Sequence, residues 1–269
     1  MKFASGARVR ALISVSLCFA LAGVAPAAAQ VTSEPPRPKT FWPSAAELRA
    51  AAGKALRDPG TWLPAAGAAM IAVAGWDRDI SDWAVEHHPI FGSSDAASEA
   101  SDNLRLASHL TMITAGLVAG ASSGGWSGML KYQLVDQGGA AATTMFTSGI
   151  KDASGRMRPD GSNHRSFPSG HTASSFALSA FSVRNINSTP VAQPLKFAAI
   201  VGSEALALGT GWARVEAGAH YPTDVLVGAA LGNFVGSLVH HVFIGRGGVV
   251  VPHVSASASG VRAGLGVTF

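Results

Sequence analysis

The sequence predicts an all-α protein built as one helical bundle, and three observations lead to that prediction. Apolar residues between positions 45 and 242 recur at helical rather than alternating spacing. Charged residues make up only 13% of the chain and the mean hydropathy is +0.26, so much of the surface is buried or faces lipid. With 269 residues, 48% of them hydrophobic, the chain is long enough for one good-sized core. We expect a single domain over residues 45–245.

The first 29 residues resemble an export signal. Three basic residues within the first ten positions precede an apolar run over 11–24, and Ala27, Ala28 and Ala29 then provide a small-residue cleavage site. The apolar run is short for a membrane span, which favours cleavage over an uncleaved anchor. Cleavage would remove the only cysteine, Cys18, and with it disulfide and thiolate chemistry. The mature chain is therefore expected to begin at Gln30 in the periplasm or cell envelope.

Residues 30–39 contain three prolines, and residues 30–44 are expected to form a linker. The helical pattern that follows is divided by Gly, Pro, Asn and Asp clusters into separate helices. Two glycine series repeat every four residues, at 116, 120 and 124 and at 228, 232 and 236, which lets neighbouring helices approach closely. The predicted helices are Ala45–Arg57, Trp62–Gly75, Arg78–His88, Leu104–Ser122, Trp126–Ile150, Gly170–Val183, Leu195–Trp212 and Thr223–Val242.

Three stretches lack charged residues: Trp62–Trp76, Leu110–Leu130 and Val225–Ile244. They are rich in Ala and Gly rather than Leu and Ile, so they are marginal membrane spans. Two interpretations stay open: partial insertion into a membrane, or buried core helices of an exported globular protein. In the tail, 246–269, apolar residues alternate with small or polar ones around Ser259-Gly260, which predicts a short C-terminal β-hairpin.

Three clusters of polar residues carry the chemistry, and each is weak evidence when taken alone. A lysine and an arginine with six residues between them are usually a solvated face, and a lone Ser-Gly-His is usually a helix start. Together they supply everything a phosphate site requires. The clusters are Lys151 with Arg158-Pro159, then Pro168-Ser169-Gly170-His171, and then Arg214, His220 and Asp224.

Phosphoryl transfer requires positive donors around the phosphate oxygens, an in-line nucleophile and an acid for the leaving oxygen. Lys151, Arg158 and Arg214 are fixed cationic donors, and the planar fork of arginine can bind two phosphate oxygens at once. Gly170 permits close approach of the anion, and Ser169 can add its hydroxyl. Because both residues open a helix, their backbone amides can also point at the anion.

His220 and Asp224 are four positions apart around Pro222, near enough for the carboxylate to accept a hydrogen bond from the far imidazole nitrogen. That contact would fix the tautomer and free the near nitrogen to attack phosphorus. His171 would protonate the leaving alkoxide and then deprotonate the hydrolytic water. The predicted intermediate is a phosphohistidine at His220.

In residues and order, these clusters resemble the type 2 phosphatidic acid phosphatase superfamily, which also holds bacterial non-specific acid phosphatases and vanadium haloperoxidases. The resemblance is close over residues 151–224 and extends to the flanking helices only in architecture. It implies the same roles: Lys151, Arg158, Ser169, Gly170 and Arg214 on phosphate, and His171, His220 and Asp224 in catalysis. The chain departs from the family pattern at Ala213, where a serine is usual, and in the short connection between Pro159 and Pro168.

The resemblance implies a metal-independent phosphatase that acts on a lipid phosphate or lipid pyrophosphate and associates with the membrane. Three alternatives stay open: a soluble periplasmic non-specific acid phosphatase, a vanadium haloperoxidase and a non-catalytic phospholipid-binding protein. No metal is expected, because adjacent histidine pairs point to different helix faces. No cofactor is expected either, and the sequence carries no nucleic-acid signature. Arg156, His164 and Arg165 are interpreted as solvated loop charges rather than substrate contacts.

Overall fold

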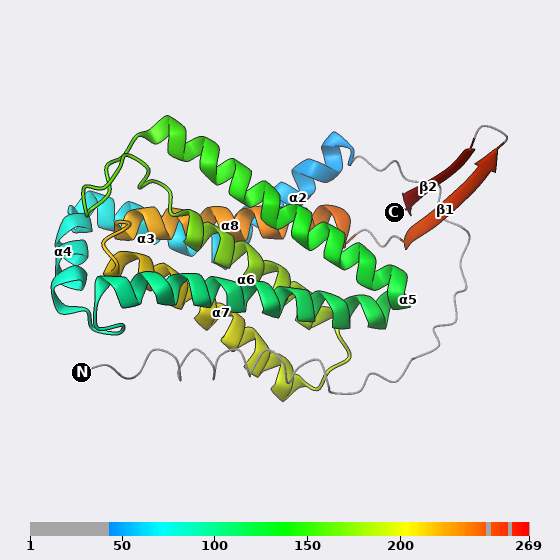
Figure 1. Cartoon of the computed structure of the whole chain (residues 1–269), viewed down its shortest axis with the longest axis horizontal. Coiled ribbons are helices and arrows are strands. Elements are labelled where there is room, and N and C mark those ends of the chain that lie inside the picture. The colour runs from blue at the N-terminus through cyan, green and yellow to red at the C-terminus, as the bar shows by residue number, and fades with distance from the viewer. Residues whose placement is uncertain (1–42, 246–248, 258–259, 269) are drawn as a thin grey trace.

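The computed structural model describes residues 43–245, 249–257 and 260–268. The predicted signal peptide and residues 30–42 of the predicted linker lie outside the described residues. Where the structure describes the chain, it is a bundle of helices followed by a hairpin, which confirms the all-α prediction (Figure 1). The elements are α2 (Ala45–Arg57), α3 (Pro59–Ala74), α4 (Asp77–His87), α5 (Ser94–Ser154), α6 (Gly170–Ser188), α7 (Gln193–Glu216), α8 (Pro222–Phe243), β1 (Val249–Ser257) and β2 (Gly260–Thr268).

Helix α5 consists of two arms joined by a sharp break, which lies between the two helices predicted at 104–122 and 126–150. The break lies at Gly124 and Gly125, and Gly125 has a φ of 60°, in the left-handed region that favours glycine. A Cβ on Gly120 would lie 2.5 Å from the Cα of Met129, so the two arms are in close backbone contact beside the break. Gly124 therefore bends the chain, whereas we had expected it to pack against a neighbouring helix.

The first arm of α5 also begins ten residues before the predicted start at Leu104, and that predicted boundary is wrong. Residues 94–103 are small and polar, so they show no apolar period. They form a helix because Ser93 caps it, its Oγ accepting a hydrogen bond from the amide of Ala96 at 3.1 Å. This additional segment reaches the site described below.

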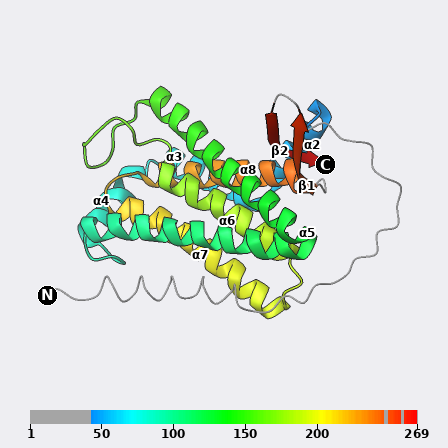
Figure 2. The same cartoon turned by 45° about the vertical axis from the view of Figure 1, so that its right-hand side comes forward.

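Helix α6 lies at the centre of the bundle, in contact with α5, α7 and α8 (Figure 2). Its Leu178 and Phe181 pack with Met112 of α5 in a fully buried cluster. Helix α8 approaches α6 at glycines: a Cβ on Gly232 would lie 2.1 Å from the carbonyl oxygen of Ala173. This contact confirms that the glycine repeat of α8 serves close helix packing. It also fixes the distance between the N-termini of α6 and α8.

Large apolar side chains are exposed over several helices, with Val73 91%, Met145 76% and Phe197 70% exposed. Among the described residues, α5 and α8 are long and apolar enough to cross a membrane, judged by length and composition. Beyond them, β1 and β2 pair antiparallel with Val249 opposite Thr268, so the predicted hairpin is present.

Candidate phosphate site

The residues of the three predicted clusters come together at one end of the bundle, where several helices start or finish. α5 ends three residues after Lys151, and Arg158 lies in the loop that follows. Ser169 caps α6, with Gly170 and His171 in its first turn. Because α7 continues to Glu216 and not only to Trp212, Arg214 lies in its last turn, and His220 and Asp224 flank the start of α8.

The loop between α5 and α6 is held by backbone hydrogen bonds rather than by its own secondary structure. Ser166 N donates to the carbonyl oxygen of Arg156 at 2.9 Å, which closes the loop on itself. Asp160 N donates to Gly218 O at 3.1 Å and Ser169 N to Asp224 O at 2.9 Å. These two contacts tie the first two clusters to the third.

Not every predicted phosphate donor is available. The amide of Ser169 already donates to Asp224, so the expectation that this amide points at the anion is wrong. The Ser169 side chain is fully buried and accepts a hydrogen bond from Thr172 Oγ1 at 2.9 Å, which leaves the Ser169 hydroxyl hydrogen to donate elsewhere. Gly170 lies beside Lys151, because a Cβ added there would be 3.4 Å from Lys151 Cε.

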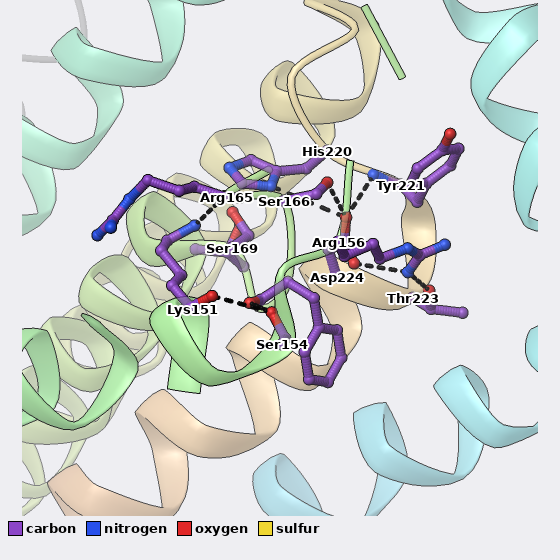
Figure 3. Close-up of polar contacts among 12 residues, drawn as sticks. Lys151, Ser154, Arg156, Arg165, Ser166, Ser169, His220, Tyr221, Thr223 and Asp224 are labelled. Carbon is purple, nitrogen blue, oxygen red and sulfur yellow. Dashed lines mark hydrogen bonds and ion pairs between the residues drawn. The ribbon is translucent and has the colours of Figure 1, made fainter. Parts of the chain in front are cut away.

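Two of the three cations, Lys151 and Arg214, are oriented by neighbouring oxygen atoms. Lys151 Nζ donates to the carbonyl oxygen of Arg165 at 2.8 Å (Figure 3). Arg214 is 7% exposed, and its NH1 donates to Ser101 Oγ at 3.1 Å. The Nε atoms of Arg158 and Arg214 are buried and have no hydrogen-bond partner among the described residues. Buried guanidinium donors without a partner are costly unless an anion satisfies them.

His220 is buried, with 1% of its surface exposed, and its Nδ1 lies 3.9 Å from Asp224 Oδ2. The two groups are an ion-pair distance apart, too far for the predicted hydrogen bond. Burial, followed by the charges of Lys151 and Arg214, lowers the pKa of His220 to about 4, although Asp224 opposes that shift. The imidazole is therefore neutral at neutral pH. Nδ1 faces the carboxylate, so Nε2 is the nitrogen left to react.

The Asp224 carboxylate is held by three hydrogen-bond donors, and His220 is not one of them. Its Oδ2 accepts from Ser166 Oγ at 2.5 Å and from the Tyr221 amide at 2.9 Å, and its Oδ1 accepts from Arg156 NH1 at 2.6 Å (Figure 3). Such charge-assisted contacts fix the carboxylate firmly beneath His220. Asp224 itself is fully buried.

Arg156 is the main correction to the sequence-based site, because it is not a solvated loop charge. Its NH2 donates to Asp77 Oδ2 at 2.5 Å, and its guanidinium stacks 4.2 Å from the centre of the Tyr221 ring. Asp77 also accepts from Thr223 N at 2.9 Å and so joins α4 to α8. Arg165 does match its interpretation, since it pairs with Asp152 on an exposed surface.

His171 has a carboxylate partner that the sequence did not reveal. Its Nε2 lies 2.9 Å from Oδ1 of Asp102, on the segment of α5 that begins earlier than predicted. Burial and the charge of Arg214 lower the pKa of His171, while Asp102 opposes them. Asp77, Ser101 and Asp102 all precede the three clusters in the sequence. For the two residues on α5, one signal was available: Ser98, Ser101, Asp102 and Arg105 are spaced so that they share one helix face.

Among the described residues, no group of three or more His, Cys, Asp or Glu side chains is arranged to hold a metal ion. The centre of the site consists of anion-binding donors, one neutral imidazole and one imidazole paired with a carboxylate. Such a set can bind a tetrahedral oxyanion, attack it and move a proton.

Comparisons with known proteins agree with this geometry. The PAP2 superfamily model matches residues 133–247. Over 114 residues, the chain is 35% identical to the lipid A 1-phosphatase of Porphyromonas gingivalis strain ATCC 33277; this alignment covers 42% of the chain but only 23% of that relative's length.

Among solved structures, the chain resembles the transmembrane PAP2 type phosphatidylglycerolphosphate phosphatase from Bacillus subtilis. The identity is 25%, with 66% of this chain and 90% of the other covered, at a TM-score of 0.49. The matched segment 133–247 contains every residue of the three clusters. This segment of the chain, about two fifths of its length, is similar to the PAP2 superfamily.

Proposed function

We propose that this protein is a metal-independent phosphatase that hydrolyses phosphate esters through a phosphohistidine at His220. The observation that carries the proposal is a buried imidazole, neutral at pH 7, beside two buried arginine Nε donors without partners. A neutral imidazole keeps its lone pair for attack, and the arginines compensate the charge of the phosphate.

In the first step, the Nε2 lone pair of His220 attacks phosphorus. A P–N bond forms as the ester P–O bond breaks, and His171 gives its proton to the departing alkoxide. Lys151, Arg158 and Arg214 bind the three remaining phosphate oxygens. Asp224 stabilises the positive charge that the ring acquires, while Nδ1 keeps its proton.

In the second step, water attacks the phosphohistidine. His171, now neutral, accepts a proton from the water as the new P–O bond forms and the P–N bond breaks. The electron pair of the P–N bond returns to Nε2, which restores the neutral imidazole. Phosphate then leaves with both histidines back in their starting states.

The substrate class we propose is a lipid phosphate or lipid pyrophosphate, hydrolysed on the periplasmic side of the membrane. Two helices of sufficient length and hydropathy support membrane association, and the exposed apolar side chains of α3, α5 and α7 support it further. The predicted export signal supports the periplasmic side. The relatives named above are lipid phosphatases.

The test is phosphate release from phosphatidic acid and from p-nitrophenyl phosphate in EDTA, comparing the purified protein with His220→Ala. We expect EDTA-resistant turnover that falls by more than about a thousandfold in the variant. His164→Ala is the matched control, because His164 is an exposed histidine of the same loop region. Preference for the soluble ester without detergent would indicate the non-specific acid phosphatase instead. Absence of turnover on both esters, with halide oxidation in vanadate, would indicate the haloperoxidase.

A further inference from the structure

The N-terminal segment of α5 forms an additional wall of the site, outside the segment that matches the family. Ser98, Ser101, Asp102 and Arg105 are spaced three and four residues apart, so they share one helix face. That face meets two residues of the clusters. Arg214 NH1 lies 3.1 Å from Ser101 Oγ and 3.5 Å from Ser98 Oγ, and His171 Nε2 lies 2.9 Å from Asp102 Oδ1.

This segment is held in place by contacts that do not involve His171. The Phe91 amide, just before α5, donates to Glu216 Oε1 at 2.7 Å. Glu216 is fully buried at the end of α7, and its other oxygen accepts from Trp212 Nε1 at 2.9 Å. The start of α5 is thus fixed to the helix that carries Arg214, and Asp102 is presented to His171 at a defined position.

The geometry points to Asp102 as a positioning residue that sets the tautomer and the proton affinity of His171. With Nε2–H donated to Asp102, Nδ1 is the ring nitrogen left to exchange a proton with the leaving oxygen and the water. The charged groups that face His171 are Arg214 from α7 and Asp102 and Arg105 from α5. Asp102 is the one anion among them, so it opposes the burial and the two arginines that disfavour the imidazolium. This role rests on the proposed function of His171.

The consequence depends on the leaving group. An alkyl phosphate needs a proton on its departing alkoxide, whereas p-nitrophenolate is stable without one. Loss of Asp102 should therefore slow an alkyl phosphate more than p-nitrophenyl phosphate. It should also move the basic limb of the kcat profile to lower pH, because His171 loses its proton sooner.

The experiment compares wild type, Asp102→Asn, Asp102→Ala and His171→Ala, with Glu99→Gln as the matched control. Glu99 is an exposed carboxylate on the same helix that makes no contact with the site in the described structure. For Asp102→Ala, we expect about a tenfold larger loss on the alkyl ester than on p-nitrophenyl phosphate. We also expect a basic limb lower by about one pH unit. Asp102→Asn should keep part of the rate, because its amide oxygen still accepts the hydrogen bond.

NMR titration of the His171 ring in wild type and Asp102→Asn gives a readout independent of turnover. A His171 pKa about one unit lower in the variant supports the inference even if neither ester is hydrolysed, in which case only the proposed function falls. An unchanged His171 titration, or equal losses on both esters with an unmoved pH profile, would overturn the role of Asp102.

Discussion

The two histidines of the site are each paired with a carboxylate, but in opposite surroundings. His220 and Asp224 are both buried, and His220 Nδ1 lies 3.9 Å from Asp224 Oδ2. His171 and Asp102 have side chains 32% and 60% exposed, and they are hydrogen-bonded at 2.9 Å. Burial keeps the first imidazole neutral and able to attack, whereas a partly solvated carboxylate helps the second to hold a proton. In the proposed mechanism, this difference is what makes His220 the nucleophile and His171 the acid, although both are histidines.

The largest expected effect tests the burial of His220. Because its pKa is lowered to about 4, the ring is neutral above that pH and becomes protonated below it. We expect kcat/KM to fall tenfold per pH unit only below about pH 4, and not from the usual histidine range near 6.5. A pH series of kcat/KM measures this. An acid limb near 6.5 would show that burial does not set the state of His220.

The next effect concerns the donors that hold Asp224. Replacing Arg156 with alanine removes its contacts with Asp77, Thr223 and Asp224, and should lower kcat by about 10- to 100-fold. Arg156→Lys should recover little, since one ammonium cannot bridge two carboxylates as the fork does. Steady-state kinetics with Arg165→Ala as control decides the matter, because Arg165 pairs only on the exposed surface. Equal losses for Arg156→Ala and Arg165→Ala would return Arg156 to the class of solvated loop charges.

A smaller loss is expected when one neutral donor is removed. Ser166→Ala deletes the 2.5 Å hydrogen bond to Asp224 Oδ2 but leaves the Tyr221 amide on the same oxygen. We expect kcat to fall about tenfold, equivalent to about 1.4 kcal/mol, with KM almost unchanged. Ser162→Ala, on the exposed part of the loop, is the control. A loss confined to KM would place Ser166 on the substrate and not behind the nucleophile.

The smallest effect on chemistry is expected from a change in the packing between α6 and α8. Gly232→Ala places a Cβ against the Ala173 carbonyl and should destabilise the fold by about 1–3 kcal/mol. Gly202→Ala, where a Cβ would meet nothing within 4 Å, should be neutral or stabilising, because alanine favours a helix. Thermal unfolding compares the two variants. A destabilised Gly202→Ala with an unaffected Gly232→Ala would contradict the close α6–α8 contact.

The sequence predicted the helical fold and the set of residues that meet at the site, because both depend on local patterns. Apolar spacing located the helices, and the clusters kept a fixed order and spacing. It did not predict the beginning of α5 at Ser94, since a small polar helix has no apolar period. For the same reason Asp102 stayed undetected. The role of Arg156 depends on Asp77, 79 residues away, and no local pattern encodes such a contact.

Trapping the covalent intermediate tests the central claim most directly. Wild-type protein is mixed with substrate, quenched in alkali to preserve phosphohistidine, digested and analysed by mass spectrometry, with His220→Ala in parallel. We predict a phosphorylated peptide whose modification maps to His220 and is absent from the variant. A wild-type protein that turns over substrate while its phosphate maps to another residue, or to none, would contradict the proposed mechanism.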